Sequence, residues 1–238
     1  MHDAAGPAGR PFPRLHVIVD SVTLAEAALR GGAPAVQVRV KTGTDRQRYA
    51  IVAAVAGRCA AAGALCVVDD RVDLALAAGA GGVHVGADDL PVDAVRRAAG
   101  PDMVVGATAR DPEAARARVA EGADYLGTGP TYATTSKDGL PDPLGPARVG
   151  AVARSVDVPV IAIAGITVAR VPEVLAEGVT GVAVIGAVTR APHPPTAVRD
   201  LLSTLAAVPY VKDRAGGRAP GDRNGPARAR GGEVPGER

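Results

Sequence analysis

The sequence predicts an α/β protein, a single (β/α)8 TIM barrel. About eight pairs of an apolar strand and a helical segment follow one another within about 200 residues, the low end for such a barrel. Glycine repeatedly ends a helix just before an apolar strand, in GGAPAVQV, GAGGVHVG, EGADYLGTG and EGVTGVAVIG, as in the αβ loops of a repeated unit. Polar residues follow nearly every expected strand, whereas a doubly wound open sheet collects them at one switch point. The barrel is therefore favoured over the open sheet.

The strands and helices of the first half follow from apolar runs and helical spacing. Strands are expected at 15–19, 35–40, 65–68 and 83–85, because Val-rich runs are typical of strands buried on both faces. Helices are expected at 24–29, 44–62 and 72–78 and from Pro91 onward, where apolar residues recur at helical spacing and glycine or proline marks an end.

The second half repeats the pattern with one long interruption. Strands are expected at 103–105, 125–126, 160–163 and 182–185, and helices at 112–121, 146–155, 170–177 and 195–207. The stretch GTGPTYATTSKDGLPDPLG after the strand at 125–126 is predicted to be a long loop.

Composition sets the domain boundaries and excludes several classes of protein. The chain has 238 residues, 47% of them hydrophobic, which is enough for one large core at 14–208. Residues 1–13 read as a flexible leader, and 209–238 as a disordered Gly/Pro/Arg-rich tail that buries too little surface to offset its ordering entropy. The net charge of +2 is spread along the chain, which predicts no nucleic-acid partner.

The compartment follows from the cysteines and from the apolar runs. Cys59 and Cys66 fall in a helix and the strand after it, which indicates buried thiols of a reducing compartment. The first residues hold no signal-peptide core, and no apolar run approaches the roughly 20 residues that span a bilayer. We therefore expect a cytoplasmic protein with no membrane partner. The sequence leaves open whether the protein forms a homo-oligomer.

Acidic residues end two neighbouring strands. Asp69 and Asp70 follow the first, and Asp88 and Asp89 follow the second. Both strands belong to one strand–helix–strand unit, so their ends lie on the same rim, about 5 Å apart. Carboxylates there suit Mg²⁺, with substrate phosphate and water completing its ligands. Alternatively, Asp70 and Asp89 cap the helices that follow.

Basic and polar side chains gather on the same rim. Gln37, Arg39 and Lys41 alternate and therefore share one face, which points into the mouth of a barrel. The alternative is an edge strand with solvated charges. Together with the acids, these residues predict a site for a highly anionic substrate such as a diphosphate.

Later loops predict a second anion site. Backbone N–H groups after the last strands form the usual phosphate cradle of this fold, although the glycines there could also be turn residues. The loop after 125–126 carries several hydroxyl groups, which favour a lid that binds phosphate over a polar surface turn. Thr108 also collects on this rim, the lid loop holds Thr134, Ser136 and Lys137, and the residues expected at the second anion are Gly165, Ile185 and Gly186.

Histidine chemistry is not expected at this rim. His84 and His16 lie inside apolar strands and read as core residues, while His2 and His193 flank prolines in loops. No Ser-His-Asp set is evident.

Jointly, these motifs resemble one family. Gln37-x-Arg39-x-Lys41, Asp69-Asp70-Arg71-Val72-Asp73, Gly86-Ala87-Asp88-Asp89, Gly127-Thr128-Gly129-Pro130, Thr134-x-Ser136-Lys137 and Ala164-Gly165-Ile166 closely resemble thiamine phosphate synthase over about 15–188. The resemblance implies a transferase that joins hydroxymethylpyrimidine diphosphate to a thiazole phosphate and releases diphosphate, with Mg²⁺.

The resemblance also implies a role for each matching residue. Asp70 and Asp89 would hold the metal, and Arg39, Lys41 and Lys137 would be catalytic through their charge. The pyrimidine diphosphate would contact Gln37, Arg39, Lys41, Asp69, Thr108 and Lys137. The thiazole phosphate would contact Thr134, Thr135, Ser136, Gly165, Ile185 and Gly186.

The chain departs from the family pattern at several positions. Asp69 stands where asparagine is usual, Thr108 and Gly186 where serine is usual, and Ala164 where glycine is usual. Two alternatives stay open: an isomerase resembling thiazole tautomerase on the same barrel, and a non-catalytic phosphate-binding paralogue.

Overall fold

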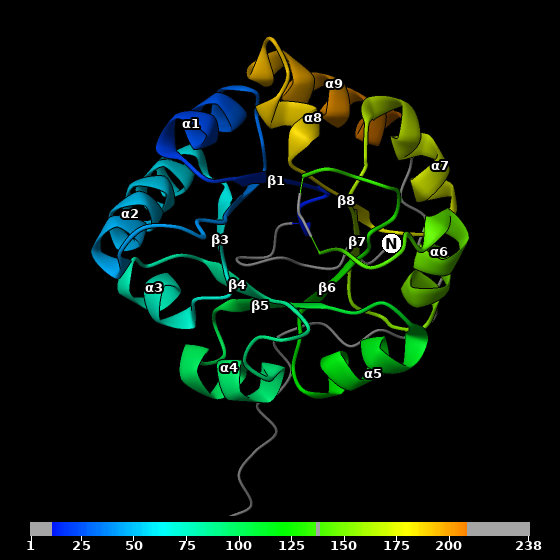
Figure 1. The fold of residues 1–238 in the computed structure, drawn as a ribbon, viewed down its shortest axis with the longest axis horizontal. Coiled ribbons are helices and arrows are strands. Elements are labelled where there is room, and N and C mark those ends of the chain that lie inside the picture. The colour runs from blue at the N-terminus through cyan, green and yellow to red at the C-terminus, as the bar shows by residue number, and fades with distance from the viewer. Residues whose placement is uncertain (1–10, 137–138, 209–238) are drawn as a thin grey trace, which may run out of the picture.

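The computed structural model describes residues 11–136 and 139–208. The described chain forms a closed barrel of parallel strands in the order β1 to β8, which confirms the expected fold. Figure 1 looks into this barrel and shows the helices as a ring around it. The expected tail at 209–238 and most of the expected leader lie outside the described residues.

The strands are short and lie close to their expected places. They are β1 (Leu15–Val19), β2 (Ala35–Val38), β3 (Leu65–Asp69), β4 (Gly82–Val85), β5 (Val104–Thr108), β6 (Tyr125–Thr128), β7 (Val160–Ile163) and β8 (Gly181–Val184). Two boundaries change the expected site. The strand expected at 35–40 ends at Val38, so Arg39 and Lys41 follow it, and β5 runs on to Thr108.

The helices surround the strands. They are α1 (Val22–Arg30), α2 (Asp45–Ala62), α3 (Val72–Ala77), α4 (Val92–Ala99), α5 (Pro112–Ala120), α6 (Gly145–Arg154), a 3₁₀ turn η2 (Val168–Arg170), α7 (Val171–Ala176), α8 (Gly186–Thr189) and α9 (Pro194–Ala207). Thr44 caps α2 in a capping box with Gln47, as its position before the Ala-rich run predicts. The short helix α8 was not expected from the sequence, which indicated only a glycine after the last strand.

The described helices differ from membrane-spanning helices. None of these helices combines the length and apolar character that crossing a membrane requires. Cys59 and Cys66 are both buried and both free thiols, as expected.

The hydrophobic core has two layers. A large outer layer of Val, Leu and Ala side chains lies between the strands and the helices. A small inner layer fills the barrel itself and consists of Phe12, Ile18, Val104, Tyr125, Ile161 and Ala183. The ring centroid of Phe12 lies 5.1 Å from that of Tyr125. Phe12, which the sequence placed in the leader, therefore closes the barrel at the end where the strands begin.

Glycine makes room inside the barrel for the Tyr125 ring. A Cβ at Gly106 on β5 would overlap the Tyr125 ring and its hydroxyl. We expect Gly106→Ala to lower the free energy of unfolding by about 1–3 kcal/mol, the usual cost of overpacking a filled core. Urea unfolding followed by circular dichroism measures this change. Gly57→Ala is the matched control, because a Cβ there meets nothing within 4 Å. Equal midpoints for the two variants would contradict the packing described.

Candidate active site

A cavity of about 960 Å³ opens where the strands end. It brings together thirteen of the fourteen residues that the sequence and the resemblance selected: Gln37, Arg39, Lys41, Asp69, Asp70, Asp89, Thr108, Thr134, Thr135, Ser136, Gly165, Ile185 and Gly186. The fourteenth, Lys137, lies outside the described residues. Residues from both halves of the sequence therefore share one site.

The basic residues after β2 are organised by Asp69. Gln37 Nε2 donates to Asp69 Oδ1 over 3.0 Å. Arg39 Nε lies 3.3 Å and Lys41 Nζ 2.7 Å from Asp69 Oδ2. Because β2 pairs with both β1 and β3 and Gln37 is only 6% exposed, the alternative of an edge strand with solvated charges is wrong.

The ion pairs of Asp69 account for an acid at a position where the family pattern usually has asparagine. Its side chain is 11% exposed and faces two cations, so positive charge from this chain lies next to the buried carboxylate. Lys41 also contacts Asp70, the next residue along the chain. The lysine therefore links the carboxylate that organises the cations to a candidate metal ligand.

Asp70 and Asp89 do not cap helices. The N-cap residues of α3 and α4 are Arg71 and Pro91, and neither helix has a side-chain cap hydrogen bond. Asp70 adopts a left-handed backbone conformation with φ 63°, which is uncommon outside glycine and concentrates at functional sites. Asp89 Oδ2 accepts a hydrogen bond from the Gly86 N–H over 2.6 Å. The capping alternative is therefore wrong.

These two carboxylates fit a hard divalent cation in part. Both line the cavity and both offer the oxygen atoms that Mg²⁺ prefers. Within the described ranges, however, no three His, Cys, Asp or Glu side chains form a complete metal site. This donor set suits Mg²⁺, which usually takes one or two carboxylates and leaves the other positions to substrate phosphate and water.

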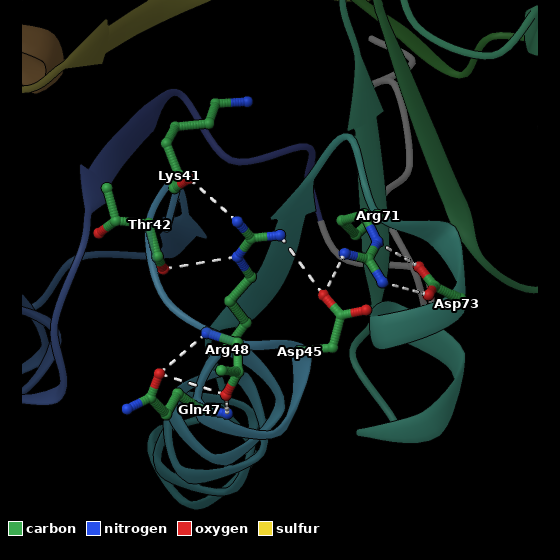
Figure 2. Close-up of polar contacts among 8 residues, drawn as sticks. Lys41, Thr42, Asp45, Gln47, Arg48, Arg71 and Asp73 are labelled. Carbon is green, nitrogen blue, oxygen red and sulfur yellow. Dashed lines mark hydrogen bonds and ion pairs between the residues drawn. The ribbon is translucent and has the colours of Figure 1, made fainter.

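A network of charged side chains joins the loops that carry Lys41 and Asp70 (Figure 2). Arg48 donates from Nη2 to the Lys41 carbonyl over 3.0 Å. Asp45 Oδ1 lies 3.4 Å from Arg48 Nη1 and 2.8 Å from Arg71 Nη1, and Arg71 also pairs with Asp73. Hydrogen bonding to Arg71 lowers the pKa of both Asp45 and Asp73. The network connects α2 to the residue that follows Asp70.

His84 does more than fill the core, which corrects the sequence-based interpretation. It lines the cavity, with Nδ1 3.0 Å from Tyr125 Oη and Nε2 3.1 Å from Thr108 Oγ1. The ring therefore orients the hydroxyl that is expected to contact the diphosphate. His16 also lines the cavity but is buried, as a core residue is expected to be. Burial and the nearby His84 lower its pKa to about 4, so it is neutral at pH 7.

The opposite side of the cavity has a strained backbone. Ala164 and Gly165 have φ angles of 75° and 68°, in the left-handed region. A Cβ at Gly165 would lie 2.7 Å from Tyr132 Cβ and 2.8 Å from the Ala133 carbonyl oxygen. Gly165 is thus required for its conformation and for the close approach of the long loop after β6.

Arg170 and Tyr132 hold this strained segment in place. Arg170 Nη1 donates to the Gly165 carbonyl over 2.7 Å, and its guanidinium lies 4.2 Å from the centre of the Tyr132 ring. Tyr132 Oη donates to Glu173 over 2.6 Å, and burial together with this bond raises the tyrosine pKa to about 12.

Sequence reasoning missed several residues that line the cavity. Among them are His84, Arg110, Arg170 and Arg190. Alternation gives a signal for His84, because it lies two residues from both Gly82 and Gly86 and so shares the inward face of β4. Arg110 lies in a loop, Arg170 ends the 3₁₀ turn η2 and Arg190 ends the short helix α8, so no periodicity marks the direction of these side chains.

Fold and site together define a class. An eight-stranded parallel barrel that carries a charged cavity at the carboxyl ends of its strands is a (β/α)8-barrel enzyme. A solved 3-hexulose-6-phosphate synthase, 21% identical with a TM-score of 0.62 over 80% of this chain and 99% of that one, shares the fold.

Closer relatives identify the family. The family model for thiamine monophosphate synthase matches residues 15–188. A thiamine-phosphate synthase of Salinispora tropica is 48% identical over 201 residues, covering 81% of this chain and 97% of that protein. A solved thiamine phosphate pyrophosphorylase from Pyrococcus furiosus is 36% identical with a TM-score of 0.76, covering 82% of this chain and 96% of that one. The chain belongs to the thiamine monophosphate synthase family.

Membership of this family establishes what class of protein the chain is. The chain is an enzyme, a transferase of thiamine biosynthesis that acts on small molecules. The relatives named above are synthases, which favours the synthase over the isomerase and the non-catalytic paralogue considered from the sequence.

Proposed function

We propose that the cavity binds hydroxymethylpyrimidine diphosphate and a thiazole phosphate side by side and joins them, with Mg²⁺, to give thiamine phosphate and diphosphate. One observation carries the proposal. Cations and carboxylates from the β2, β3 and β4 loops line the same cavity as the hydroxyls and glycines from the β6, β7 and β8 loops. In the closed barrel order these two groups of strands lie across the mouth from each other.

The diphosphate belongs on the side of β2 to β5. Arg39 and Lys41 supply positive charge, and Gln37 and Thr108 supply hydrogen-bond donors at the same mouth. Asp69 holds Gln37, Arg39 and Lys41 together before substrate enters, so these donors need little reorganisation when it binds. Lys137, from the loop after β6, is proposed as a third catalytic cation on the strength of the family motif alone.

Asp70 and Asp89 would hold Mg²⁺ at this end. When bound, the ion would neutralise charge that accumulates on the leaving diphosphate. Lys41 contacts Asp70 in this structure, so the lysine and the metal ligand lie close enough for the diphosphate to meet both. The protein would supply two oxygen ligands and leave the remaining positions to the substrate.

The reaction needs charge stabilisation more than proton transfer. The bond between the pyrimidine methylene carbon and the diphosphate oxygen breaks, and its electron pair leaves with the diphosphate. Arg39, Lys41 and Lys137 would stabilise that departing charge. The lone pair of the thiazole nitrogen then forms the new carbon–nitrogen bond to the pyrimidine cation. Positioning both substrates in one cavity supplies much of the remaining rate.

The thiazole phosphate belongs on the other side. Thr134, Thr135 and Ser136 offer hydroxyls, and Gly165, Ile185 and Gly186 line the same part of the cavity and offer backbone groups. Arg170 fixes the Gly165 carbonyl, which keeps this backbone in its left-handed conformation.

Removal of the metal tests the proposal directly. We expect the purified protein to form thiamine phosphate from both phosphorylated substrates with Mg²⁺, and to lose that activity in excess EDTA because the diphosphate can then no longer be neutralised. Product is measured by chromatography, and restoring Mg²⁺ in excess over EDTA is the control. Activity that persists in EDTA would contradict the role of the metal. Binding of both substrates without product would instead support a non-catalytic protein.

A further inference from the structure

Arg190 enters the cavity from the end of α8. It is the residue that ends this helix, and its side chain lines the cavity beside the loop after β6. Nη1 lies 3.4 Å from Thr135 Oγ1 and Nη2 lies 3.3 Å from Ser136 Oγ, and both nitrogens donate to these hydroxyls. No ion pair of Arg190 is found within the described residues, so its charge is not neutralised by a carboxylate there.

Gly186 has no side chain, which leaves the space that the Arg190 guanidinium occupies beside Thr135 and Ser136. A Cβ at Gly186 would overlap the Arg190 guanidinium and would lie 2.6 Å from its Cζ. Any side chain at position 186 would therefore have to displace the arginine. The family pattern usually has serine at this position, so this chain exchanges a hydroxyl for a guanidinium next to the same backbone.

We propose that Arg190 binds the phosphate group of the thiazole substrate and sets the preference for a phosphorylated thiazole over the free alcohol. This inference rests on the proposed function, because it assigns a new ligand within the thiazole side of that site. Guanidinium presents paired N–H donors that match two oxygens of a phosphate, and a charged donor discriminates a dianion from a neutral hydroxyl. The two Arg190 nitrogens that donate to Thr135 and Ser136 also lie beside Gly186. All three of these residues are expected to contact the thiazole phosphate.

Steady-state kinetics of Arg190→Ala test this assignment. We expect KM for the thiazole phosphate to rise by about tenfold to a hundredfold, the equivalent of one lost charge-assisted contact. KM for the pyrimidine diphosphate should stay unchanged, because all of its proposed ligands except Lys137 lie on β2 to β5 and the loops that follow these strands. The ratio of kcat/KM for thiazole phosphate to that for thiazole alcohol should fall by a similar factor. Arg190→Lys, which keeps the charge and loses the paired donors, should fall between the two proteins.

The matched control is Arg97→Ala, which removes an exposed arginine on α4 that pairs only with Asp93 among the ion pairs of the described chain. All of its kinetic constants should equal those of the wild type. Unchanged KM for thiazole phosphate in Arg190→Ala, with an active wild type, would overturn the role of Arg190 and leave the proposed function standing.

An inactive wild type would instead overturn the proposed function and leave Arg190 to be tested by binding. Inorganic phosphate is then titrated calorimetrically into the wild type and Arg190→Ala. Weaker binding by the variant supports a phosphate site at Arg190, and equal binding overturns it.

Discussion

Replacing Asp70 by asparagine is expected to reduce turnover by at least about 10³-fold, because the substitution removes a charged oxygen ligand of the proposed magnesium site. Asparagine keeps the size of the side chain and tolerates the left-handed backbone that Asp70 adopts at φ 63°. The loss should therefore reflect charge rather than misfolding. Initial rates over a range of Mg²⁺ concentrations measure the effect, and saturation should shift to higher Mg²⁺.

Asp69→Asn is the matched control, one residue away. Asp69 faces Gln37, Arg39 and Lys41 rather than the proposed metal, and an asparagine oxygen can still accept the Gln37 hydrogen bond. We expect turnover within about tenfold of the wild type, since the variant loses two ion pairs but leaves both cations available to the diphosphate. A loss of turnover as large as that of Asp70→Asn, with no change in the Mg²⁺ requirement of either variant, would contradict these assignments. Asp70 would then not be distinguished as a metal ligand from Asp69, which faces the cations.

Lys41→Met is expected to lower kcat by about 10²–10³-fold, the usual effect of removing one preorganised electrostatic contact to a developing charge. Lys41 contacts both Asp69 and Asp70, so its ammonium group lies where the diphosphate must meet the metal ligands. Methionine keeps the length of the chain without the charge. Single-turnover measurements with saturating substrates report the chemical step and separate it from product release.

Arg58→Met is a suitable control for Lys41→Met, because Arg58 is a partly exposed cation of α2 that pairs with Glu26 on α1. Its single-turnover rate should equal that of the wild type. A rate for Lys41→Met within twofold of the control would remove Lys41 from the proposed chemistry.

The fold could be predicted from the sequence because its signals are local and repeated. Val-rich runs at 15–19 and 160–163 became strands with the expected bounds, and Thr44 capped α2 as its sequence context indicates. The end of β5 was harder to place, since Gly106 breaks the apolar run even though it lies in the strand to accommodate Tyr125. The helix α8 has only four residues, too few for any helical periodicity to appear.

The candidate site was predictable where side chains follow directly from the ends of strands. Gln37, Asp69 and Asp70 lie at such ends, and parallel strands bring them to one rim whatever the details of the loops. What could not be predicted are the contacts between them. The ion pairs of Asp69, the contact of His84 with Thr108 and the reach of Arg190 across to Thr135 depend on side-chain directions between separate loops.

The measurement that most directly tests the shared metal site is a crystal structure of the protein grown with Mg²⁺ and inorganic diphosphate. We expect one ion held by carboxylate oxygens of both Asp70 and Asp89, with the diphosphate completing its ligands and contacting Arg39 and Lys41. Two carboxylates that point apart and share no ion, with the diphosphate bound elsewhere, would contradict the account.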